Sequence, residues 1–262
     1  MRKIKLFSSD LNGTLVKQHT MSDMIKIYLD EKKYQQAKKF FELQTAGKAT
    51  MEETFSHVAP LSKGLTLRQS IEYTRDHLLY SIGFSHFIDE LRSREIPLVI
   101  NSTGYSVTIY SIRAQIEEGT IHGHIGNNLK FESDNGAILT EDELEKLVFN
   151  YFLPSNYLDN VYDKIKSIDK IELGINNESA KTKLILDYAE KHFHSIKPNE
   201  IAHMGDTMGD SIGIYEIAKL GGLGIAFNPN DSLLHFINNL TQDIRKNIIF
   251  VKDDLSEVLS KI

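Results

Sequence analysis

Residues 4–15 read IKLFSSDLNGTL, an apolar run that ends at Asp10 and leads into an asparagine–glycine pair. A short apolar run that stops at small and acidic residues is typical of a strand buried on both faces of a parallel sheet. A carboxylate at the end of such a strand can attack phosphorus and become an acyl phosphate. A simple turn is the competing interpretation, because Asn12-Gly13 is a strong turn signal by itself. Asp10 is therefore a candidate nucleophile whose role depends on the rest of the chain.

The same pattern recurs in later segments, which we expect to be further strands. Helical spacing over residues 85–94 and 210–220 alternates with them. This alternation favours an α/β fold with a Rossmann-like parallel sheet as its core. Ligands of such sheets bind at the carboxyl ends of the strands. The later apolar runs cover residues 97–100, 201–204, 224–227 and 248–251.

The segment 16–84 has a different character. Helical spacing appears around 22–38 and 67–80, with few strand signals between them. Because this segment is inserted between the first two predicted strands, we expect it to be a helical cap domain. Residues 1–15 and 85–262 would then form the α/β core.

Residues 121–139 alternate in a way that predicts a β-hairpin within the core. Its turns would lie at Gly126-Asn127-Asn128 and at Asp134-Asn135-Gly136. Thr140 and Glu143 then have the spacing of a capping box, which predicts the start of a helix.

Composition excludes several classes of protein. The chain has 262 residues, which suits one core domain with a modest accessory unit, and it contains no cysteine for a disulfide or a thiolate nucleophile. Its formal net charge of -6 argues against nucleic acid or an anionic membrane as the main partner. We see neither a secretory signal nor an apolar run of the ~18 residues that a membrane helix needs, so we expect a cytoplasmic protein.

A second polar loop follows the predicted strand at 97–100. The Ser102 hydroxyl and an N–H group of Thr103 or Gly104 could hold a phosphate oxygen. Gly13 allows the first loop to approach a phosphate closely, so that its exposed N–H groups could bind the same ligand. Serine, threonine and glycine after a strand are common in loops, so this signal is weak alone.

Lys181 lies in the first turn of a helix predicted over residues 179–190. Ile185 and Ala189 follow at four-residue spacing, which places Lys181 on the inward face of that helix. A cation there could neutralise a transferring phosphoryl group and its nucleophile. Lys183 is the competing candidate, and an exposed position is the ordinary one for a lysine.

The sequence GDTMGD at 205–210 places two carboxylates at a strand end and the following helix start. Such a pair is well suited to a hard divalent cation. Asp206 would bind the metal, whereas Asp210 would bind it through water or hold Lys181. Asp210 could equally be the N-cap of the helix.

Taken together, the order of these elements resembles the four-motif pattern of the haloacid dehalogenase-like (HAD) superfamily. The resemblance covers essentially the whole chain and is nearest to the phosphoserine-phosphatase-like branch, which has a helical cap after the first motif. Three further stretches resemble that branch: LSKGLT at 61–66, GNNLKF at 126–131 and LGGLGIAFN at 220–228.

The resemblance implies a Mg²⁺-dependent phosphatase that acts on a small phosphorylated metabolite through an aspartyl-phosphate intermediate. Asp10 would attack the phosphoryl group, and Ser102 and Lys181 would bind it, together with Gly13 and Thr103. The magnesium ligands would be Asp10, the backbone carbonyl of Asn12 and Asp206, and Asp210 would support the metal or the lysine.

Asn12 departs from the pattern of the phosphatases that the chain resembles. Position 12 is normally an aspartate that protonates the leaving oxygen and later deprotonates the attacking water. An amide can form hydrogen bonds there but cannot transfer a proton at neutral pH. The backbone carbonyl of residue 12 remains available to a metal.

Three explanations of Asn12 remain open. The sequence could carry an engineered aspartate-to-asparagine substitution that traps a substrate. The protein could be a slow phosphatase or a phosphotransferase whose intermediate survives. It could also be a catalytically weak protein that binds a phosphorylated ligand and regulates another process. A dehalogenase is disfavoured, since it would not need the pair Asp206 and Asp210.

The substrate is not predicted beyond a small phosphate ester. Phosphoserine enzymes use a cap carboxylate soon after the first motif and a cap arginine, but here no acidic residue occurs between the motif and Asp23. Lys63 and Arg68 cannot be placed relative to the site from the sequence. The oligomeric state is not predicted either.

Overall fold

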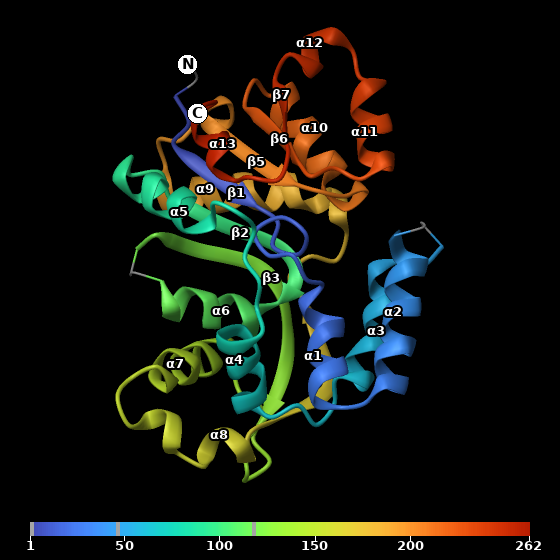
Figure 1. Cartoon of the computed structure of the whole chain (residues 1–262), viewed down its shortest axis with the longest axis vertical. Helices are drawn as coiled ribbons and strands as arrows, with labels where there is room; N and C mark the ends of the chain where they lie inside the picture. The colour runs from blue at the N-terminus through green and yellow to red at the C-terminus, as the bar shows by residue number, and fades with distance from the viewer. Residues whose placement is uncertain (1–2, 46–47, 117–118) are drawn as a thin grey trace.

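The computed structural model describes residues 3–45, 48–116 and 119–262. In this part of the chain a seven-stranded sheet has the order β4-β3-β2-β1-β5-β6-β7 (Figure 1). Neighbouring strands are parallel except for β4, which pairs antiparallel with β3. The α/β prediction and the five predicted strands are confirmed. The strands are β1 (Leu6–Ser9), β2 (Leu98–Tyr105), β3 (Ile121–Glu132), β4 (Lys166–Leu173), β5 (Ile201–Gly205), β6 (Leu223–Phe227) and β7 (Ile248–Val251).

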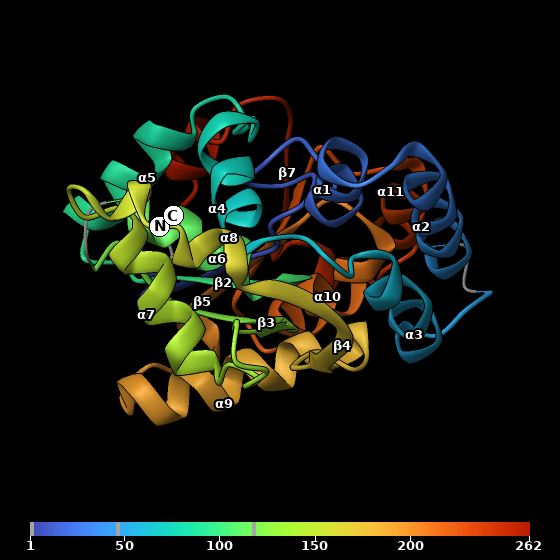
Figure 2. The ribbon, with the colours of Figure 1, turned by 90° about the horizontal axis from the view of Figure 1, so that it is seen from below.

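Alternate side chains of the central strands enter two different cores. Phe7 packs with α5 (Phe84–Ser93) and α13 (Ser256–Leu259) on one face of the sheet. Its neighbour Leu6 packs with α9 (Lys181–Phe193) and α10 (Ser211–Lys219) on the other. Figure 2 shows α5 and α9 on opposite sides of the sheet. Burial on both faces explains why these strands are continuous apolar runs in the sequence.

The described residues of the predicted cap segment, 16–45 and 48–84, form four helices: α1 (Thr20–Tyr28), α2 (Glu31–Thr45), α3 (Met51–Leu61) and α4 (Leu67–Asp76). The helical pattern around 22–38 is divided between α1 and α2, because the carboxylate of Asp30 accepts a hydrogen bond from the N–H of Lys33 (2.8 Å) and starts a new helix. A capping box of Thr50 and Glu53 begins α3.

The buried side chains of these helices form one small cluster of their own, Ile25, Ala37 and Val58, and otherwise join a core that they share with the sheet. Phe55 of α3 and Tyr73 of α4 belong to the same apolar cluster as Phe131 of β3 and Val148 of α7 (Glu141–Tyr151). Figure 1 shows α4 beside α6 (Ser106–Gln115) and α8 (Val161–Lys164). The division into a core and a cap domain stays a prediction.

The hairpin turn that we expected at Gly126-Asn127-Asn128 is wrong, because β3 continues without a turn from Ile121 to Glu132. The Asn127 side chain explains this, since it bonds to neighbouring backbone on both sides. Its Nδ2 donates to the carbonyl oxygen of Thr103 (3.0 Å), and its Oδ1 accepts from the N–H of Ile175 (3.0 Å). The polar residues therefore join the strand to its surroundings. The chain reverses at 133–137, and the capping box of Thr140 and Glu143 then begins α7.

The remaining helices complete the layer around β5 to β7: α11 (Asp231–Asn238) and α12 (Gln242–Arg245). Two short 3₁₀ turns, η2 (Glu178–Ala180) and η4 (Met208–Asp210), precede α9 and α10. Among the described residues, no helix is long and apolar enough to cross a membrane.

Candidate active site

Five predicted site residues lie at the carboxyl ends of adjacent strands or at the starts of the helices that follow. Asp10 follows β1, Ser102 lies in β2 and Asp206 follows β5. Asp210 ends η4, and Lys181 is the first residue of α9. Because β1 lies between β2 and β5, residues that are nearly two hundred positions apart in the sequence meet at one edge of the sheet.

Three carboxylates form the centre of this arrangement. Ligand oxygens of Asp10, Asp206 and Asp210 all lie within 4.8 Å of one another. Asp206 is held by Thr14, whose hydroxyl donates to Oδ1 (3.1 Å). Gly13 has a φ of 78°, and a β-carbon at this position would lie 2.1 Å from Oδ2 of Asp206. The glycine therefore allows both the left-handed conformation and the close approach of the first loop to Asp206.

Lys181 is the counter-charge of this cluster. Its Nζ donates to Oδ1 of Asp10 (3.0 Å) and to Oδ1 of Asp210 (2.6 Å), and its side chain is only 3% exposed. Burial alone would lower the pKa of Lys181, but the two carboxylates outweigh it and raise the pKa. Lys183, the competing candidate, is exposed.

The carboxylates are short of positive charge. Burial raises the pKa of Asp10, although Lys181 opposes that shift. Burial also raises the pKa of Asp206, and the neighbouring Asp210 and Asp10 raise it further. Three carboxylates thus share one ammonium group, and their oxygens are the ligand type that hard divalent cations prefer. The donor set fits a magnesium ion.

Asp210 also shapes the loop between β5 and α10. Its Oδ2 accepts hydrogen bonds from the N–H groups of Asp206 (3.2 Å) and Thr207 (3.3 Å), and its Oδ1 accepts from Lys181. The side chain makes no capping bond to α10, although Asp210 occupies the N-cap position. Its interactions therefore connect the acidic loop to the lysine.

Of the predicted phosphate-binding residues, Thr103 and Lys181 line the cavity at Asp10, whereas Ser102 is buried beside Asp10. The buried Ser102 hydroxyl bonds to Asp10 and accepts from the N–H of Gly104 (3.2 Å). Thr103 lines the same cavity as Asp10 and Lys181. These positions allow a phosphoryl group to meet the hydroxyl, the ammonium group and the carboxylate together.

Asn12 lines the cavity and has a structural contact as well. Its Oδ1 accepts a hydrogen bond from the N–H of Thr20 (3.0 Å), the first residue of α1. The side chain thereby ties the first loop to the beginning of the predicted cap segment. A carboxylate oxygen could accept the same bond, so the fold does not require an amide at this position.

A buried polar chain beneath Lys181 was not predicted from the sequence. His203 Nδ1 lies 3.0 Å from the Ser8 hydroxyl, and Nδ2 of Asn101 donates to the carbonyl oxygen of Lys181 (3.0 Å). Asn101 Nδ2 also lies 3.5 Å from the Ser8 hydroxyl. Asn101 thereby holds the first residue of α9 in place, and the His203 ring lies against Gly213 of α10. The sequence signal for this polar chain is that Ser8 follows Phe7 and Asn101 follows Ile100, so that the polar side chains point to the opposite face of the sheet from their apolar neighbours.

The cavity at the carboxylates has a volume of about 110 Å³. It is also lined by His19, Phe41, Gln44 and Glu178, none of which the sequence singled out. Glu178 lies three residues before Lys181 in the turn that leads into α9, which was the one local signal. The others come from α2 or the loop before α1, so their placement depends on how the helices of segment 16–84 fold over the sheet.

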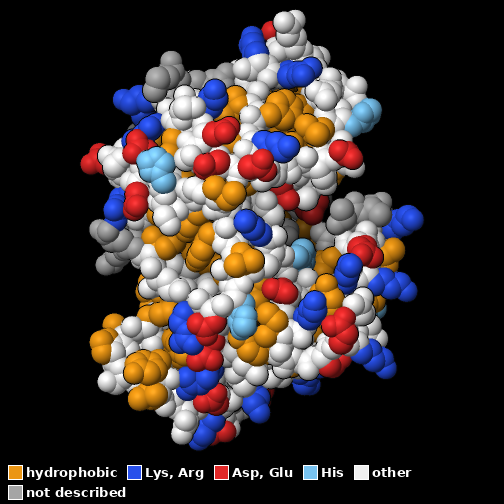
Figure 3. All heavy atoms as spheres, viewed as in Figure 1, with side chains coloured by type: hydrophobic (Ala, Val, Ile, Leu, Met, Phe, Trp, Pro, Cys, Tyr) orange, Lys and Arg blue, Asp and Glu red, His pale blue; other side chains and the backbone are white. Residues whose placement is uncertain are grey.

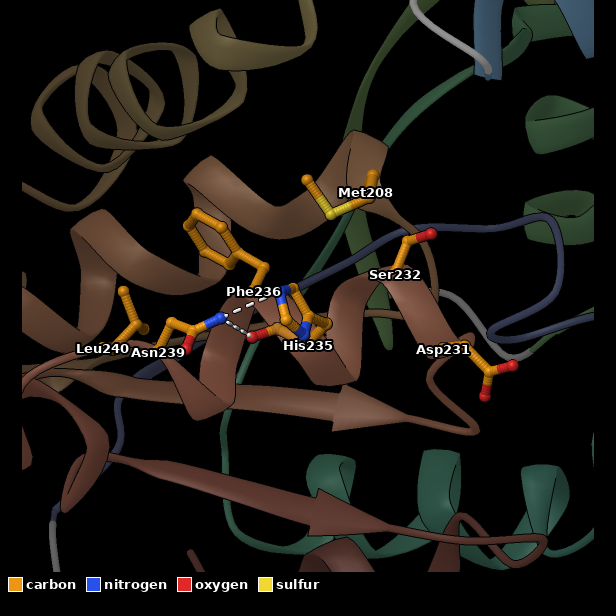
Figure 4. Close-up of a pocket in the computed structure, with 7 residues that line it drawn as sticks. All are labelled: Met208, Asp231, Ser232, His235, Phe236, Asn239 and Leu240. Atoms are coloured by element: carbon orange, nitrogen blue, oxygen red, sulfur yellow. Dashed lines mark hydrogen bonds between the residues drawn. The ribbon is translucent and has the colours of Figure 1, made fainter.

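A larger hollow of about 630 Å³ lies on α11, beside Met208 of η4 (Figure 4). Its lining includes His235, Phe236 and Leu240, and its polar contacts are local: Nδ2 of Asn239 donates to the carbonyl oxygen of His235 (2.9 Å). None of the site carboxylates lines it. The smaller cavity at Asp10 is therefore the candidate active site.

The face of the molecule in Figure 3 carries acidic and basic side chains interspersed with one another. Charged side chains of the protein form ion pairs, such as Arg68 with Asp163 (2.8 Å) and Lys63 with Asp169 (3.2 Å). Both Lys63 and Arg68, whose positions the sequence left open, are thus engaged with partners in β4 and α8 and do not line the cavity at Asp10.

No protein-family model and no curated protein sequence matches this chain. Solved structures do match. A phospho-aspartyl intermediate analogue of phosphoserine phosphatase aligns over 100% of both chains with 20% identity and a TM-score of 0.67. A substrate-bound phosphoserine phosphatase complex aligns over 100% of both chains with 20% identity and a TM-score of 0.68. A HAD family hydrolase from Salmonella enterica serovar Typhi has 16% identity and a TM-score of 0.65, over 89% of this chain and 66% of that one.

At such identities the matches establish the fold, while the active-site argument rests on this chain's own residues. The predicted resemblance is confirmed at the level of structure. The chain has, over its full length, the fold of phosphoserine phosphatases and HAD family hydrolases, and it carries a carboxylate cluster of Asp10, Asp206 and Asp210 at the carboxyl ends of the central strands.

Proposed function

We propose that this protein is a magnesium-dependent phosphatase that acts on a small phosphate ester through an aspartyl-phosphate intermediate at Asp10. The observation that supports this most strongly is the buried Lys181, which contacts both Asp10 (3.0 Å) and Asp210 (2.6 Å). Burying a lysine between two carboxylates costs free energy, because three ionic groups have to leave water, and a role in catalysis would explain why the arrangement is kept. Here it places positive charge where a phosphoryl group would be attacked.

Each residue has a separate part in the reaction. An Asp10 oxygen forms a bond to phosphorus while the bond from phosphorus to the alcohol oxygen breaks. The Lys181 ammonium and the Ser102 hydroxyl bind phosphoryl oxygens, on which negative charge is concentrated. Water then attacks phosphorus, which releases inorganic phosphate and restores the Asp10 carboxylate.

The residues that would hold magnesium are Asp10, Asp206 and the backbone carbonyl of Asn12, with Asp210 beside them. When bound, the ion supplies positive charge that offsets both the carboxylates and the phosphoryl oxygens. Thr14 would orient the Asp206 carboxylate through its hydrogen bond. Gly13 would allow the carboxylate to lie close to the first loop, because it has no β-carbon.

Asn12 gives this phosphatase an imbalance between its two half-reactions. A good leaving group departs without a proton, so Asp10 can still capture the phosphoryl group. The attacking water, however, has no carboxylate at position 12 to receive its proton. With such leaving groups, release is therefore the slow half-reaction, whereas the alcohol oxygen of an alkyl ester has to take its proton from solvent as it departs.

The same observation favours phosphoryl transfer as a second candidate function. An aspartyl phosphate that reacts slowly with water survives long enough to meet another acceptor, such as an alcohol. The two functions share the first half-reaction and differ in the acceptor of the second.

Magnesium is expected to be required for turnover of p-nitrophenyl phosphate, and excess EDTA is expected to abolish it. The physical reason is the excess of carboxylates over cations at the site. The measurement is the initial rate of p-nitrophenol release with and without Mg²⁺, and KCl at matched ionic strength is the control. Undiminished turnover in EDTA would contradict the proposed function.

Magnesium is also expected to stabilise the protein more at pH 8 than at pH 5. Burial raises the carboxyl pKa values of Asp10 and Asp206 in the folded state, so above the ordinary carboxyl pKa of about 4 the folded protein binds more protons than the unfolded chain. The free energy of unfolding of the metal-free protein should therefore fall as the pH rises from about 4 to about 8, the raised pKa of Asp206. Thermal unfolding at both pH values measures the effect, and an equal magnesium-induced rise in Tm at both would contradict it.

A further inference from the structure

Glu178 lies at the boundary between two cavities. One is the cavity of about 110 Å³ at Asp10. The other is an outer groove of about 450 Å³, lined by residues of α2, α3 and the turn before η2. Gln44 and Glu178 line both spaces, and Nε2 of Gln44 donates to Oε1 of Glu178 (3.1 Å). This pair therefore separates the catalytic cavity from the groove outside it.

The size of the inner cavity limits what it can hold. At about 110 Å³ it is smaller than the outer groove of about 450 Å³. A phosphoryl group bound at Asp10 and Lys181 lies in this smaller space, and the outer groove has more room for the rest of a substrate. The alcohol part of a substrate must consequently reach toward Gln44 and Glu178.

The chain itself sets the distance between the two ends of the substrate. Glu178 and Lys181 are three residues apart at the start of α9, a separation that places β-carbons roughly 5–6 Å apart on a helical turn. With the phosphoryl group at Lys181, the rest of a small ester lies in the same cavity as Glu178. A small phosphate ester fits this span.

The charge at the far end of the cavity is negative. Glu178 is half-buried and packs against Gly209, where a β-carbon would lie 2.8 Å from its Oε1. Glu52 adds a second carboxylate in the outer groove. Burial raises the pKa of Glu178 and Asp210 raises it further, although Lys181 and the hydrogen bond from Gln44 oppose the shift.

Positive charge is scarce among the residues that line these two spaces. Of the described residues that do so, Lys181 is the sole lysine or arginine, and it already contacts Asp10 and Asp210. Desolvation lowers the pKa of His19, so its ring carries no charge at pH 8. A carboxylate on the substrate would thus meet Glu178 and Glu52 with no cation to pair with.

We propose that Glu178 determines specificity by binding an ammonium group on the alcohol part of the substrate. The substrate class is the phosphate monoester of a small amino alcohol that has no carboxylate, and it enters through the outer groove as the Gln44–Glu178 hydrogen bond opens. This inference rests on the proposed function for the position of the phosphoryl group. It excludes phosphorylated amino acids as the preferred substrates.

Three esters that differ in one group each provide the test. O-Phosphoethanolamine carries the ammonium group, 2-hydroxyethyl phosphate replaces it with a hydroxyl, and O-phosphoserine adds a carboxylate. Calorimetric binding to the full chain with Mg²⁺ at pH 8 is expected to give O-phosphoethanolamine the lowest Kd, by about tenfold over each of the other two. Because binding is measured, the result does not depend on turnover.

Glu178→Gln is expected to bring the three Kd values to within about twofold of one another, since the amide keeps the bond from Gln44 but loses the charge. Glu42→Gln removes an exposed carboxylate of α2 that lines neither cavity, and it is expected to keep the tenfold preference. The inference is overturned if the parent chain shows no preference. It is also overturned if Glu178→Gln weakens all three esters equally, because Glu178 would then act at the phosphoryl end.

The two proposals fail in different ways. Tight, Glu178-dependent binding of O-phosphoethanolamine without turnover of any ester would contradict the phosphatase and leave the specificity intact. Turnover of p-nitrophenyl phosphate without a preference among the three esters would support the phosphatase and contradict the proposed specificity.

Discussion

Asn12→Asp is expected to raise kcat for p-nitrophenyl phosphate with Mg²⁺ by about 10²–10⁴-fold, the usual range for general acid–base catalysis. The new carboxylate would receive the proton of the attacking water, which speeds the release of phosphate from Asp10. The substitution suits the structure, because a carboxylate oxygen can accept the hydrogen bond that Asn12 now accepts from the N–H of Thr20 (3.0 Å). That bond would also hold the carboxylate in place at the start of α1.

Two controls are needed for the comparison between the parent chain and the Asn12→Asp variant. Asn12→Ala removes the side chain without supplying a base, so its rate should not exceed that of the parent chain. Asparagine followed by glycine deamidates readily, so each sample needs an intact-mass check for aspartate formed at residue 12. Equal rates for the mass-verified parent chain and the Asn12→Asp variant would show that position 12 has no acid–base role.

Asp10→Asn is expected to reduce turnover of every phosphate ester to the background rate. The amide is nearly the same size as the carboxylate but cannot form the acyl phosphate. The loss should come without unfolding, because the change removes one of the three carboxylates that share the charge of Lys181. In metal-free buffer at pH 8 the variant should be at least as stable as the parent, a common relation at sites where function strains the fold.

The matched control is Asp187→Asn, which removes an exposed carboxylate from α9. It should keep the activity of the parent chain. Thermal unfolding of both variants separates a chemical defect from a folding defect. Turnover by a well-folded Asp10→Asn protein would rule out Asp10 as the nucleophile.

The local sequence predicts the parallel strands well, because burial on both faces leaves a distinctive mark. Leu6 and Phe7 enter opposite cores, and both are apolar. The edge of the sheet is harder to predict. The residues of Lys166–Leu173 mix exposed, partly buried and buried positions without a regular alternation, so the sequence gives no clear signal for β4. Asn127 looked like a turn residue because it follows Gly126 in the sequence. Its bonds to Thr103 and Ile175, which keep it in the strand, are contacts with distant residues that the local sequence does not reveal.

The candidate site follows the same division. Asp10, Lys181 and Asp206 could be predicted, since each follows a strand or begins a helix and their order in the chain resembles a known pattern. Gln44 and Phe41 could not, because no local feature of α2 shows which of its faces will cover the carboxylates. Glu178 is intermediate, since its spacing from Lys181 is local but the cavity it lines is not.

The central claim is that Asp10 captures a phosphoryl group faster than it releases one. Rapid mixing of the unmodified chain with p-nitrophenyl phosphate and Mg²⁺ tests this most directly, with acid quenching and peptide mapping of the product. The account predicts a burst of about one p-nitrophenol per protein chain, followed by slow turnover, with the phosphoryl group on the peptide that contains Asp10. Turnover from the start without a burst, or a phosphoryl group on another residue, would contradict it.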